Sequence, residues 1–373
     1  CRTLKEYDIA INYYKMIPDN LNCQIKLANI YEKLNDLDNM IDWYKKAADY
    51  ISNLPIRCAF VSTNSICQGQ QVQPIWEPLF NSGIHIDFAW QTFVWSSEAS
   101  IQAHVYVVII GFSRFGYQTK SLYLSNGEKK SCSNINGYLM DGVDVFVDKR
   151  SKTLCDVLPM TRGSQPTDAG NLILEPYEKE KLLLEEPAAE KWIKPFSMGN
   201  EFINNKERFC LWMEGITPSE LAVLPLVSKR VEAVREMRLA SSKAATRKKA
   251  EIPWLFDEIK EPTSENFIVV PVVSSERRFY VPIGFVSNGL IPGNKLFFID
   301  NATLYDFGVI VSQFQNAWMR RVCGRLESRY SYSNTIVYNN FVWPEATNEQ
   351  KKAIEQTAQV ILNARSNYTN KSL

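Results

Sequence analysis

Hydrophobic residues recur at helical spacing in the first 54 residues of the chain. Tyr7, Ile11 and Tyr14 follow one such stripe, and residues 41–48 follow another. The two stretches lie about thirty residues apart and resemble each other, as repeats of a tetratricopeptide array do. The pattern therefore predicts a helical segment over residues 1–54, either a tetratricopeptide-like pair or two or three amphipathic helices.

Residues 55–117 change to a β-rich pattern. A short run of this kind at 57–62 is followed by a helical stretch at 70–80. Three further strands are predicted at 84–88, 92–95 and 103–112. The last is almost continuously apolar, which is typical of a strand that is buried on both faces. The order of strand, helix, strand and strand is that of the second half of an α/β sheet domain.

The remainder of the chain alternates between irregular and structured stretches. Residues 118–195 are rich in Asn, Gly, Ser and Asp, and they predict a linker that could hold one hairpin. A long helical stretch at 219–249 then precedes three strands, and an amphipathic helix is predicted at 348–365. The three strands are predicted at 267–273, 278–285 and 295–299. The pattern therefore predicts a mixed α+β unit over residues 196–305 and a helical C-terminal segment over residues 306–373.

Composition and charge narrow the classes of function. The chain has 373 residues, of which 45% are hydrophobic and 22% charged, a globular balance that excludes overall disorder and leaves room for two or three domains. Its 42 basic and 41 acidic residues give a net charge of +1, so a nucleic-acid surface must come from local segregation of charge. The longest apolar run, residues 105–110, is too short to span a membrane.

The cysteines, histidines and first residue carry further expectations. The eight cysteines are scattered without a Cys-x-x-Cys pair, which favours reduced thiols and a cytoplasmic location. His85 and His104 are the only histidines, and neither has the spacing to cysteine that a metal site needs, so we expect no metal. The chain begins at Cys1 and not at Met, which we interpret as a fragment of a longer protein.

Ten short motifs follow one another in order between residues 59 and 344. The first are AFVSTNSI with QGQQ from residue 59, FAWQTFVW from residue 88, and the run from His104 to IIGFS. The middle ones are FINNK with FCLW, RLAS, SSERR, YVPIGF and NATLY, between residues 202 and 305. The last two are CGRLESRY at 323–330 and VYNNFVWP at 337–344. In this order the motifs resemble the MmeI-like restriction–modification proteins, which join a nuclease, an adenine methyltransferase and a target-recognition domain in one chain.

The resemblance implies a fold and a function. Residues 55–117 would be the C-terminal part of a methyltransferase domain, the second half of a class I S-adenosylmethionine-dependent sheet, and residues 1–54 could be its helices. Residues 118–195 would be a linker, 196–305 the target-recognition domain and 306–373 a C-terminal domain. The whole protein would transfer a methyl group from S-adenosylmethionine to adenine N6 at specific sites of double-stranded DNA, in a bacterial restriction–modification system.

Two catalytic elements of the family have no counterpart here. The catalytic Asn-Pro-Pro-Phe loop is missing because the chain contains no Pro-Pro pair, and the glycine-rich cofactor loop is missing because it contains no Gly-x-Gly. We therefore expect a DNA-reading chain that is inactive alone and needs an N-terminal catalytic part, in cis or in trans. One alternative is a non-catalytic specificity module whose residues 1–50 dock onto a separate catalytic subunit. The other is a tetratricopeptide scaffold, which would explain only those first residues.

Residues near the ends of the predicted strands are candidates for contact with the target base. An adenine methyltransferase must flip its target base out of the duplex, and aromatic faces can replace the lost stacking. Phe93 and Trp95 are the candidate pair, although aromatic residues beside a buried strand are more often core residues. Asn64, Ser65 and Gln68 follow a strand end, where α/β sheets place ligand loops. They would lie near the target base or the cofactor, unless they form a polar turn that caps the next helix.

Positive charge is concentrated in one stretch of the chain. Residues 229–249 hold eight basic and two acidic residues, a local excess of +6. Such a face could lie along DNA phosphates, which gives salt-dependent affinity without sequence information. The alternative is a solvated helix face. The candidate phosphate contacts are Lys229, Arg230, Arg235, Arg238, Lys243 and Arg247.

Two pairs of charged residues are candidates for reading bases. Arg277 and Arg278 fall between two predicted strands, and an arginine can bond both acceptors of a guanine edge. Glu327 and Arg329 would point to the same side of an extended segment and could read the cytosine and guanine of one base pair. The resemblance implies a base-specifying pair at this place. The alternatives are an ion pair with Glu276 for the first two residues and a surface ion pair for the second two.

Overall fold

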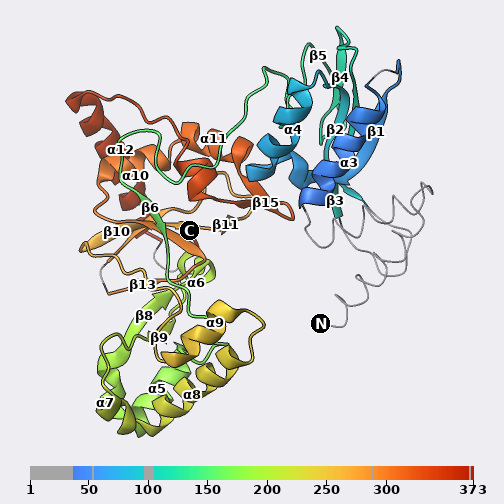
Figure 1. Ribbon diagram of the computed structural model, residues 1–373. Helices are drawn as coiled ribbons and strands as arrows, with labels where there is room; N and C mark the ends of the chain where they lie inside the picture. The colour runs from blue at the N-terminus through green and yellow to red at the C-terminus, as the bar shows by residue number, and fades with distance from the viewer. Residues whose placement is uncertain (1–36, 53, 96–104, 288, 369–370) are drawn as a thin grey trace. The chain divides into compact units, whose positions relative to one another are not determined.

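The computed structural model describes residues 37–373 except 53, 96–104, 288 and 369–370 (Figure 1). The predicted helical stripe through Tyr7, Ile11 and Tyr14 lies outside the described residues, as does His104. The chain divides into two compact units. The first unit comprises the described residues up to Lys149 together with Arg321–Ser328, and the second comprises Arg150–Arg320 and Arg329–Leu373.

The first unit is built on a five-stranded sheet with the order β1-β3-β2-β4-β5 (Figure 1). β3 is antiparallel to both β1 and β2, so these two strands run in the same direction, and β4 is parallel to β2. The burial of β3 is nearly continuous, as its apolar sequence predicted. The strands are β1 (Cys58–Thr63), β2 (His85–Trp95), β3 (Val105–Ser113), β4 (Lys120–Tyr123) and β5 (Lys129–Cys132).

Aromatic side chains join two helices to this sheet, namely α3 (Leu37–Tyr50) and α4 (Val72–Asn81). The ring of Tyr44 in α3 lies 5.1 Å from that of Phe60 in β1 and 5.3 Å from that of Trp76 in α4. It also lies 5.5 Å from the ring of Phe112 in β3. Tyr44 is buried in this core, so α3 is an integral part of the first unit. The alternative in which residues 1–50 form a docking arm is therefore wrong for the residues of α3.

Two sequence predictions for the first unit need correction. The strands predicted at 84–88 and 92–95 form one strand, β2, whose pairing with β3 shifts register between Trp90 and Phe93. This irregularity interrupts the alternation of side chains, which is why the pattern indicated two strands. The hairpin expected within 118–195 is formed by β4 and β5, and it extends the sheet of the first unit.

The second unit contains two four-stranded sheets, with the orders β12-β10-β14-β6 and β13-β8-β9-β7. A further strand, β16 (Arg329–Ser331), pairs with β11 (Val273–Ser274). The strands of the first sheet are β6 (Met160–Arg162), β10 (Asn266–Pro271), β12 (Gly284–Ser287) and β14 (Leu296–Ile299). Those of the second are β7 (Ile173–Leu174), β8 (Ile193–Ser197), β9 (Phe209–Leu211) and β13 (Ile291–Pro292).

The long helix predicted at 219–249 is broken into α7 (Pro218–Ala222), α8 (Pro225–Leu239) and α9 (Ala244–Lys248). α7 begins with a capping box in which Thr217 Oγ1 accepts from Glu220 N at 3.3 Å. α8 is capped by the buried carboxylate of Glu186, which accepts from the backbone N–H groups of Leu226 and Val227. A proline stands at the first position of both helices, where its missing N–H costs no hydrogen bond.

The other helices and strands follow the sequence patterns more closely. The strands predicted at 267–273 and 295–299 correspond to β10 and β14, whereas only the end of the strand predicted at 278–285 belongs to β12. The amphipathic helix predicted at 348–365 is α12 (Asn348–Ser366). The remaining helices are α5 (Pro176–Glu185), α6 (Gly199–Asn204), α10 (Leu304–Ile310) and α11 (Gln313–Val322). The described chain is thus a mixed fold of helices and several sheets.

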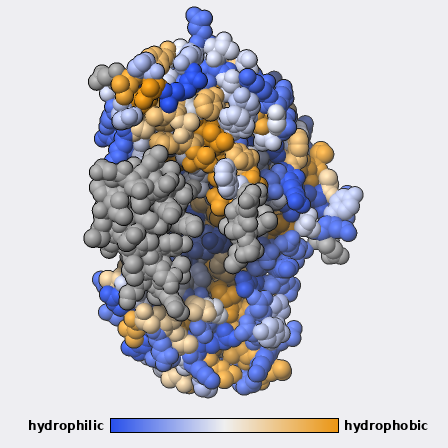
Figure 2. Space-filling view, turned by 90° about the vertical axis from the view of Figure 1, so that its right-hand side faces the viewer, coloured by the Kyte–Doolittle hydropathy of each residue, from blue (hydrophilic) through white to orange (hydrophobic). Residues whose placement is uncertain are grey.

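The distribution of hydrophobic and of potential metal-ligating side chains in the described residues determines whether they can form membrane-spanning helices or metal sites. On the face shown in Figure 2, hydrophobic residues form separate patches between hydrophilic ones. No helix in the described part of the chain has the length and apolar character needed to cross a membrane. Over the same residues, no group of three or more His, Cys, Asp and Glu side chains could hold a metal ion.

Asp300, which follows β14, holds the turn that leads into β10. Its carboxylate accepts hydrogen bonds from the backbone N–H groups of Thr263 and Ser264 at 3.0 and 2.9 Å and from both hydroxyl groups. Partial desolvation opposes ionisation, but hydrogen bonds from Ser264 and Thr263 outweigh it and lower the pKa of Asp300. A carboxyl with a lowered pKa stabilises the fold above its unfolded pKa, and this contribution is lost as the pH falls.

We expect Asp300→Asn to lower the free energy of unfolding by about 1–2 kcal/mol at pH 7, after allowance for solvent screening. The difference between wild type and variant should shrink as the pH falls below about 4, where the unfolded carboxyl becomes protonated. Urea unfolding of both proteins at several pH values measures this difference. A difference that stays constant between pH 7 and pH 3 would contradict the role of the ionised carboxylate.

Candidate nucleic-acid interface

The loop after β1 consists of two short turns, η1 (Asn64–Cys67) and η2 (Gly69–Gln71). Asn64 directly follows the strand and is only 8% exposed, and its Nδ2 has no hydrogen-bond partner among the described residues. Ser65 Oγ lies 2.9 Å from Thr63 Oγ1, and the Ser65 carbonyl accepts from Gln68 N at 3.1 Å. The position of Asn64, Ser65 and Gln68 at a strand end is therefore as predicted. None of these side chains caps α4.

β3 brings this loop and the aromatic candidates to one edge of the sheet, namely the edge formed by the carboxyl ends of β1 and β2. Thr63, the last residue of β1, and Phe93 of β2 are both register partners of Val107. Because neighbouring strands are about 4.8 Å apart, the Cα atoms of Thr63 and Phe93 are separated by about 10 Å. The rings of Phe93 and Trp95 have centroids 6.4 Å apart, and Trp95 is 47% exposed. Trp95 is therefore outside the core, at the same edge as Asn64.

A third segment contacts the loop after β1. This segment is β15 (Gly324–Leu326), which lies within Arg321–Ser328, the stretch that belongs to the first unit although the chain before and after it belongs to the second. A Cβ atom on Gly69 would lie 3.0 Å from Gly324 N, so the two backbones are in direct contact. Glu327 follows β15 and is exposed. The predicted base-reading residue thus follows, three residues later, a backbone contact with the loop that contains Asn64.

The side-chain geometry predicted for Glu327 and Arg329 is wrong. Glu327 and Ser328 form a turn, and Glu327 has a φ of +59°, in the left-handed region. Arg329 is the first residue of β16 and is half-buried. The alternation of an extended segment does not apply across such a turn, so the two side chains do not simply share one side of a strand. The residue pattern did not indicate this turn, because Glu is uncommon in this conformation.

Arg277 and Arg278 lie in the segment between β11 and β12, as predicted. The Arg277 side chain is 91% exposed, and its Nε is 3.9 Å from the Glu276 carboxylate, a distance at which an exposed ion pair contributes little. Two aromatic residues that follow were missed as candidates. Phe279 and Tyr280 are 66% and 44% exposed, and their ring centroids are 4.9 Å apart. The sequence Arg277-Arg278-Phe279-Tyr280, in which two aromatic residues directly follow two arginines, could have indicated these two residues as candidates.

Arg238 is not a phosphate contact. It is completely buried, and its guanidinium donates to five backbone carbonyl groups. These carbonyls belong to Pro166, Thr167, Lys249, Ile252 and Leu255, at 2.8–3.3 Å. The prediction for Arg238 is therefore corrected, because a guanidinium with these partners is a structural link between three segments of the second unit.

The other basic candidates divide into two groups. Arg230 is ion-paired with Glu178 at 2.6 Å and donates to the carbonyls of Asn171 and Ile173. Its guanidinium therefore also links segments of the second unit. The remaining four side chains are exposed, and Arg235 lies only 3.8 Å from an exposed Glu232 carboxylate. These exposed candidates are Lys229, Arg235, Lys243 and Arg247.

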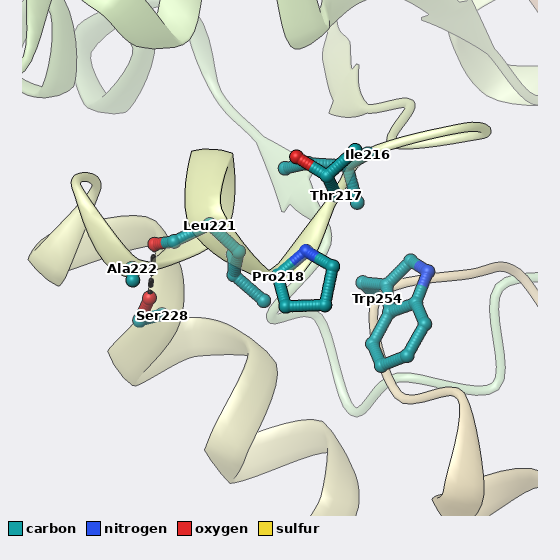
Figure 3. Close-up of a pocket in the computed structure, with 7 residues that line it drawn as sticks. All are labelled: Ile216, Thr217, Pro218, Leu221, Ala222, Ser228 and Trp254. Atoms are coloured by element: carbon teal, nitrogen blue, oxygen red, sulfur yellow. Dashed lines mark hydrogen bonds between the residues drawn. The ribbon is translucent and has the colours of Figure 1, made fainter.

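One pocket of about 240 Å³ lies in the second unit, beside α7 (Figure 3). Leu221 and Pro218 face it from α7, and Trp254 closes the opposite side. Ser228 Oγ donates to the Leu221 carbonyl at 2.7 Å and holds α7 against α8. The lining has no charged side chain and includes none of the predicted site residues.

We expect Arg238→Ala to lower the stability of the second unit by about 3–5 kcal/mol, because five buried carbonyl groups lose their donor. Arg238→Lys should destabilise nearly as much, since an ammonium keeps the charge but cannot reproduce the planar five-donor fork. Arg235→Ala is the matched control on the same helix and should change stability by less than about 0.5 kcal/mol. Denaturant unfolding measures all three. Equal stability of Arg238→Ala and Arg235→Ala would refute the structural role.

Comparison with known proteins adds two family matches. The model described as "MmeI, DNA-methyltransferase domain" matches residues 19–124, and the model described as "MmeI, target recognition domain" matches residues 141–345. The first match includes residues 19–54 and favours their assignment to the methyltransferase domain over a tetratricopeptide array. The boundary between the two structural units, after Lys149, lies close to the division between the two matches.

Two relatives show the same similarity over nearly the whole chain. DNA methyltransferase A of Bacillus subtilis (strain 168) is 36% identical over 342 residues, which are 91% of this chain and 39% of that protein. The solved structure of the Type IIL restriction-modification enzyme MmeI in complex with DNA is 45% identical to this chain, with a TM-score of 0.87. The match covers 90% of this chain and 45% of the MmeI chain. The chain thus spans less than half the length of either relative.

Proposed function

Because the chain belongs to the MmeI family of restriction–modification DNA methyltransferases, we propose that it is the DNA-reading and target-positioning part of a site-specific adenine-N6 methyltransferase. The observation that carries the proposal is the convergence at one sheet edge. Asn64 lies in the loop after β1, the strand that leads to Glu327 contacts this loop, and Trp95 lies at the same end of the sheet. In this arrangement, the residue that reads a base is held close to the residues that would receive the flipped base.

The side chains at this edge have the chemistry that a flipped adenine requires. An unstacked base needs aromatic faces, which Phe93 and Trp95 supply. An asparagine amide carries one donor and one acceptor, the pair that complements adenine N7 and the N6 amino group. Asn64 Nδ2 is buried without a partner among the described residues, so a base that reached it after a local movement of the loop would satisfy a group that otherwise costs free energy. Ser65 and Gln68 belong to the same loop and add a hydroxyl and a second amide group to it.

The sheet of the first unit fits the second half of a class I methyltransferase sheet. Its antiparallel strand β3 lies between the parallel strands β1 and β2, and β1 has a single strand partner among the described residues. The other edge of β1 could therefore pair with the first half of the sheet. The one glycine of the loop after β1, Gly69, is packed against Gly324, so its backbone is not open to S-adenosylmethionine. We therefore propose that cofactor binding and the catalytic loop lie in an N-terminal part, in cis or in trans.

The exposed basic residues of the second unit would hold DNA by its phosphates. Contacts to phosphates release condensed counterions, so the affinity falls steeply with salt for every DNA sequence alike. Lys229, Arg235, Lys243 and Arg247 are the residues proposed for this role, and Arg230 could contribute only by leaving Glu178. Arg277 and Arg278 lie beside exposed aromatic residues and are proposed to contact base edges.

We expect the triple variant Arg235→Ala, Lys243→Ala, Arg247→Ala to bind duplex DNA with a flatter dependence on salt. Each phosphate contact that is lost should reduce the slope of log K against log salt by about one unit. Fluorescence anisotropy with specific and unrelated duplexes measures the slope. The matched control removes three exposed lysines elsewhere, Lys351, Lys352 and Lys371, and should keep the slope. Equal slopes for the triple variant and the wild type would exclude the basic stretch from the interface.

We expect Glu327 and Arg329 to select one base pair of the target. Alanine at either position should relax preference at that base pair by about 1–3 kcal/mol, or roughly 5- to 150-fold, and leave the others intact. The double change Glu327→Lys with Arg329→Asp exchanges donor and acceptor and should invert the preferred base pair. Selection from a randomised duplex pool, with the complete gene product that carries this chain, measures the preference.

Ser328→Ala is the control for this experiment, because it alters the same turn without removing either charge. An unchanged consensus for the exchanged pair would show that Glu327 and Arg329 form only a structural ion pair. A wild-type protein that methylates no DNA, or methylates it without sequence preference, would refute the proposed function itself.

A further inference from the structure

Gly69 makes a close backbone contact between the loop after β1 and β15. A Cβ atom at this position would lie 3.0 Å from Gly324 N, 3.1 Å from Gly324 Cα and 3.8 Å from the Cys323 carbonyl carbon. These are backbone atoms, which cannot turn aside as the end of a long side chain can. Gly69 also has a φ of +56°, where residues with a side chain are strained. Only glycine therefore fits here without moving β15.

The surroundings of Gly69 make the contact rigid. Gly69 is buried and is the first residue of η2. The turns of η1 and η2 are closed by hydrogen bonds from Gln68 N to Ser65 O and from Gln71 N to Gln68 O. Ile66 and Cys67, which precede it, are buried in the core of the first unit. The loop therefore cannot yield easily, and an added methyl group at Gly69 would displace β15.

The contact lies close to the turn that carries Glu327. Gly324 and Glu327 are three residues apart, which corresponds to about 10 Å of extended chain. Stacked base pairs are separated by only about 3.4 Å. A bidentate hydrogen bond to a base tolerates changes of a few tenths of an ångström in the N···O distance before it weakens. A shift of β15 by about an ångström would therefore move Glu327 out of register with its base pair.

We propose that Gly69 is a positioning residue that couples target reading to target placement. Through its contact with Gly324, it fixes the distance between Glu327 and the loop that contains Asn64. The proposal rests on the proposed function, because it presumes that the turn at Glu327 reads DNA and that the loop after β1 receives the target base. Its effect is on specificity, not on the general affinity for DNA.

The experiment compares Gly69→Ala with wild type in the complete gene product. Two quantities are measured: methylation of the selected target against duplexes with single-base substitutions, and affinity for unrelated duplex DNA at low salt. We expect discrimination at the base pair assigned to Glu327 to fall by about tenfold, while discrimination elsewhere and the affinity for unrelated DNA stay within about twofold. Unchanged discrimination in a folded Gly69→Ala protein would overturn the inference.

Two further glycine variants separate the contact from other effects. Gly116 has nearly the same φ, +55°, but a Cβ there would meet only the flexible His85 ring, at 3.4 Å. Gly116→Ala thus reports the backbone strain alone and should keep discrimination. Gly324→Ala places its Cβ where no heavy atom of the described residues lies within 4 Å, so it too should keep discrimination. A loss in either control as large as that in Gly69→Ala would overturn the inference.

Thermal unfolding shows whether each variant is folded. If Gly69→Ala does not fold, Gly69→Asn replaces it, because asparagine tolerates the left-handed conformation better and still carries the Cβ atom. A wild-type protein without any sequence preference would refute the proposed function before the variants are compared. A wild type with sequence preference and a Gly69 variant that retains it would refute only the role of Gly69.

Discussion

The hydrogen bonding of β3 to both β1 and β2 is the constraint on which the candidate interface depends. An antiparallel strand between two parallel ones forces their carboxyl ends to the same edge, and the shared partner Val107 fixes how far each strand extends there. The loop with Asn64 and the aromatic pair at Phe93 and Trp95 are thereby placed by backbone geometry. Neither depends on a long, flexible connection. A bound base would meet groups whose positions are set before it arrives, which reduces the ordering cost of binding.

The structural units do not follow the chain in sequence. Arg321–Ser328 belongs to the first unit, while the residues before and after it belong to the second. The segment next to Glu327 therefore lies within the match to the target recognition domain in sequence, but is anchored on the unit that matches the methyltransferase domain. Because Arg321–Ser328 packs on the first unit, its position relative to the loop after β1 does not depend on a flexible linker.

Local sequence patterns were sufficient for features that depend on neighbours along the chain. The apolar run of β3, the position of Asn64 at a strand end and the amphipathic helix α12 all follow from hydrophobic periodicity and turn residues. Arg238 could not be assigned in this way, because its burial depends on carbonyl groups up to 72 positions away in sequence. A count of charges treats this buried arginine and the exposed Arg235 alike. The turn at Glu327 and the backbone contact of Gly69 likewise depend on tertiary packing that no periodicity encodes.

The exposed turn at Glu327 has a consequence for how such proteins diverge. A side chain outside the core can be exchanged with little change in folding free energy, so, under the proposed role of Glu327, new target preferences would arise there by single substitutions without loss of the scaffold. The left-handed backbone also biases which replacements are accessible. Asn, Asp and Gly adopt a φ near +59° most readily, whereas β-branched residues are disfavoured. The residues accessible at this position are therefore limited by backbone conformation, whatever the side chain contacts.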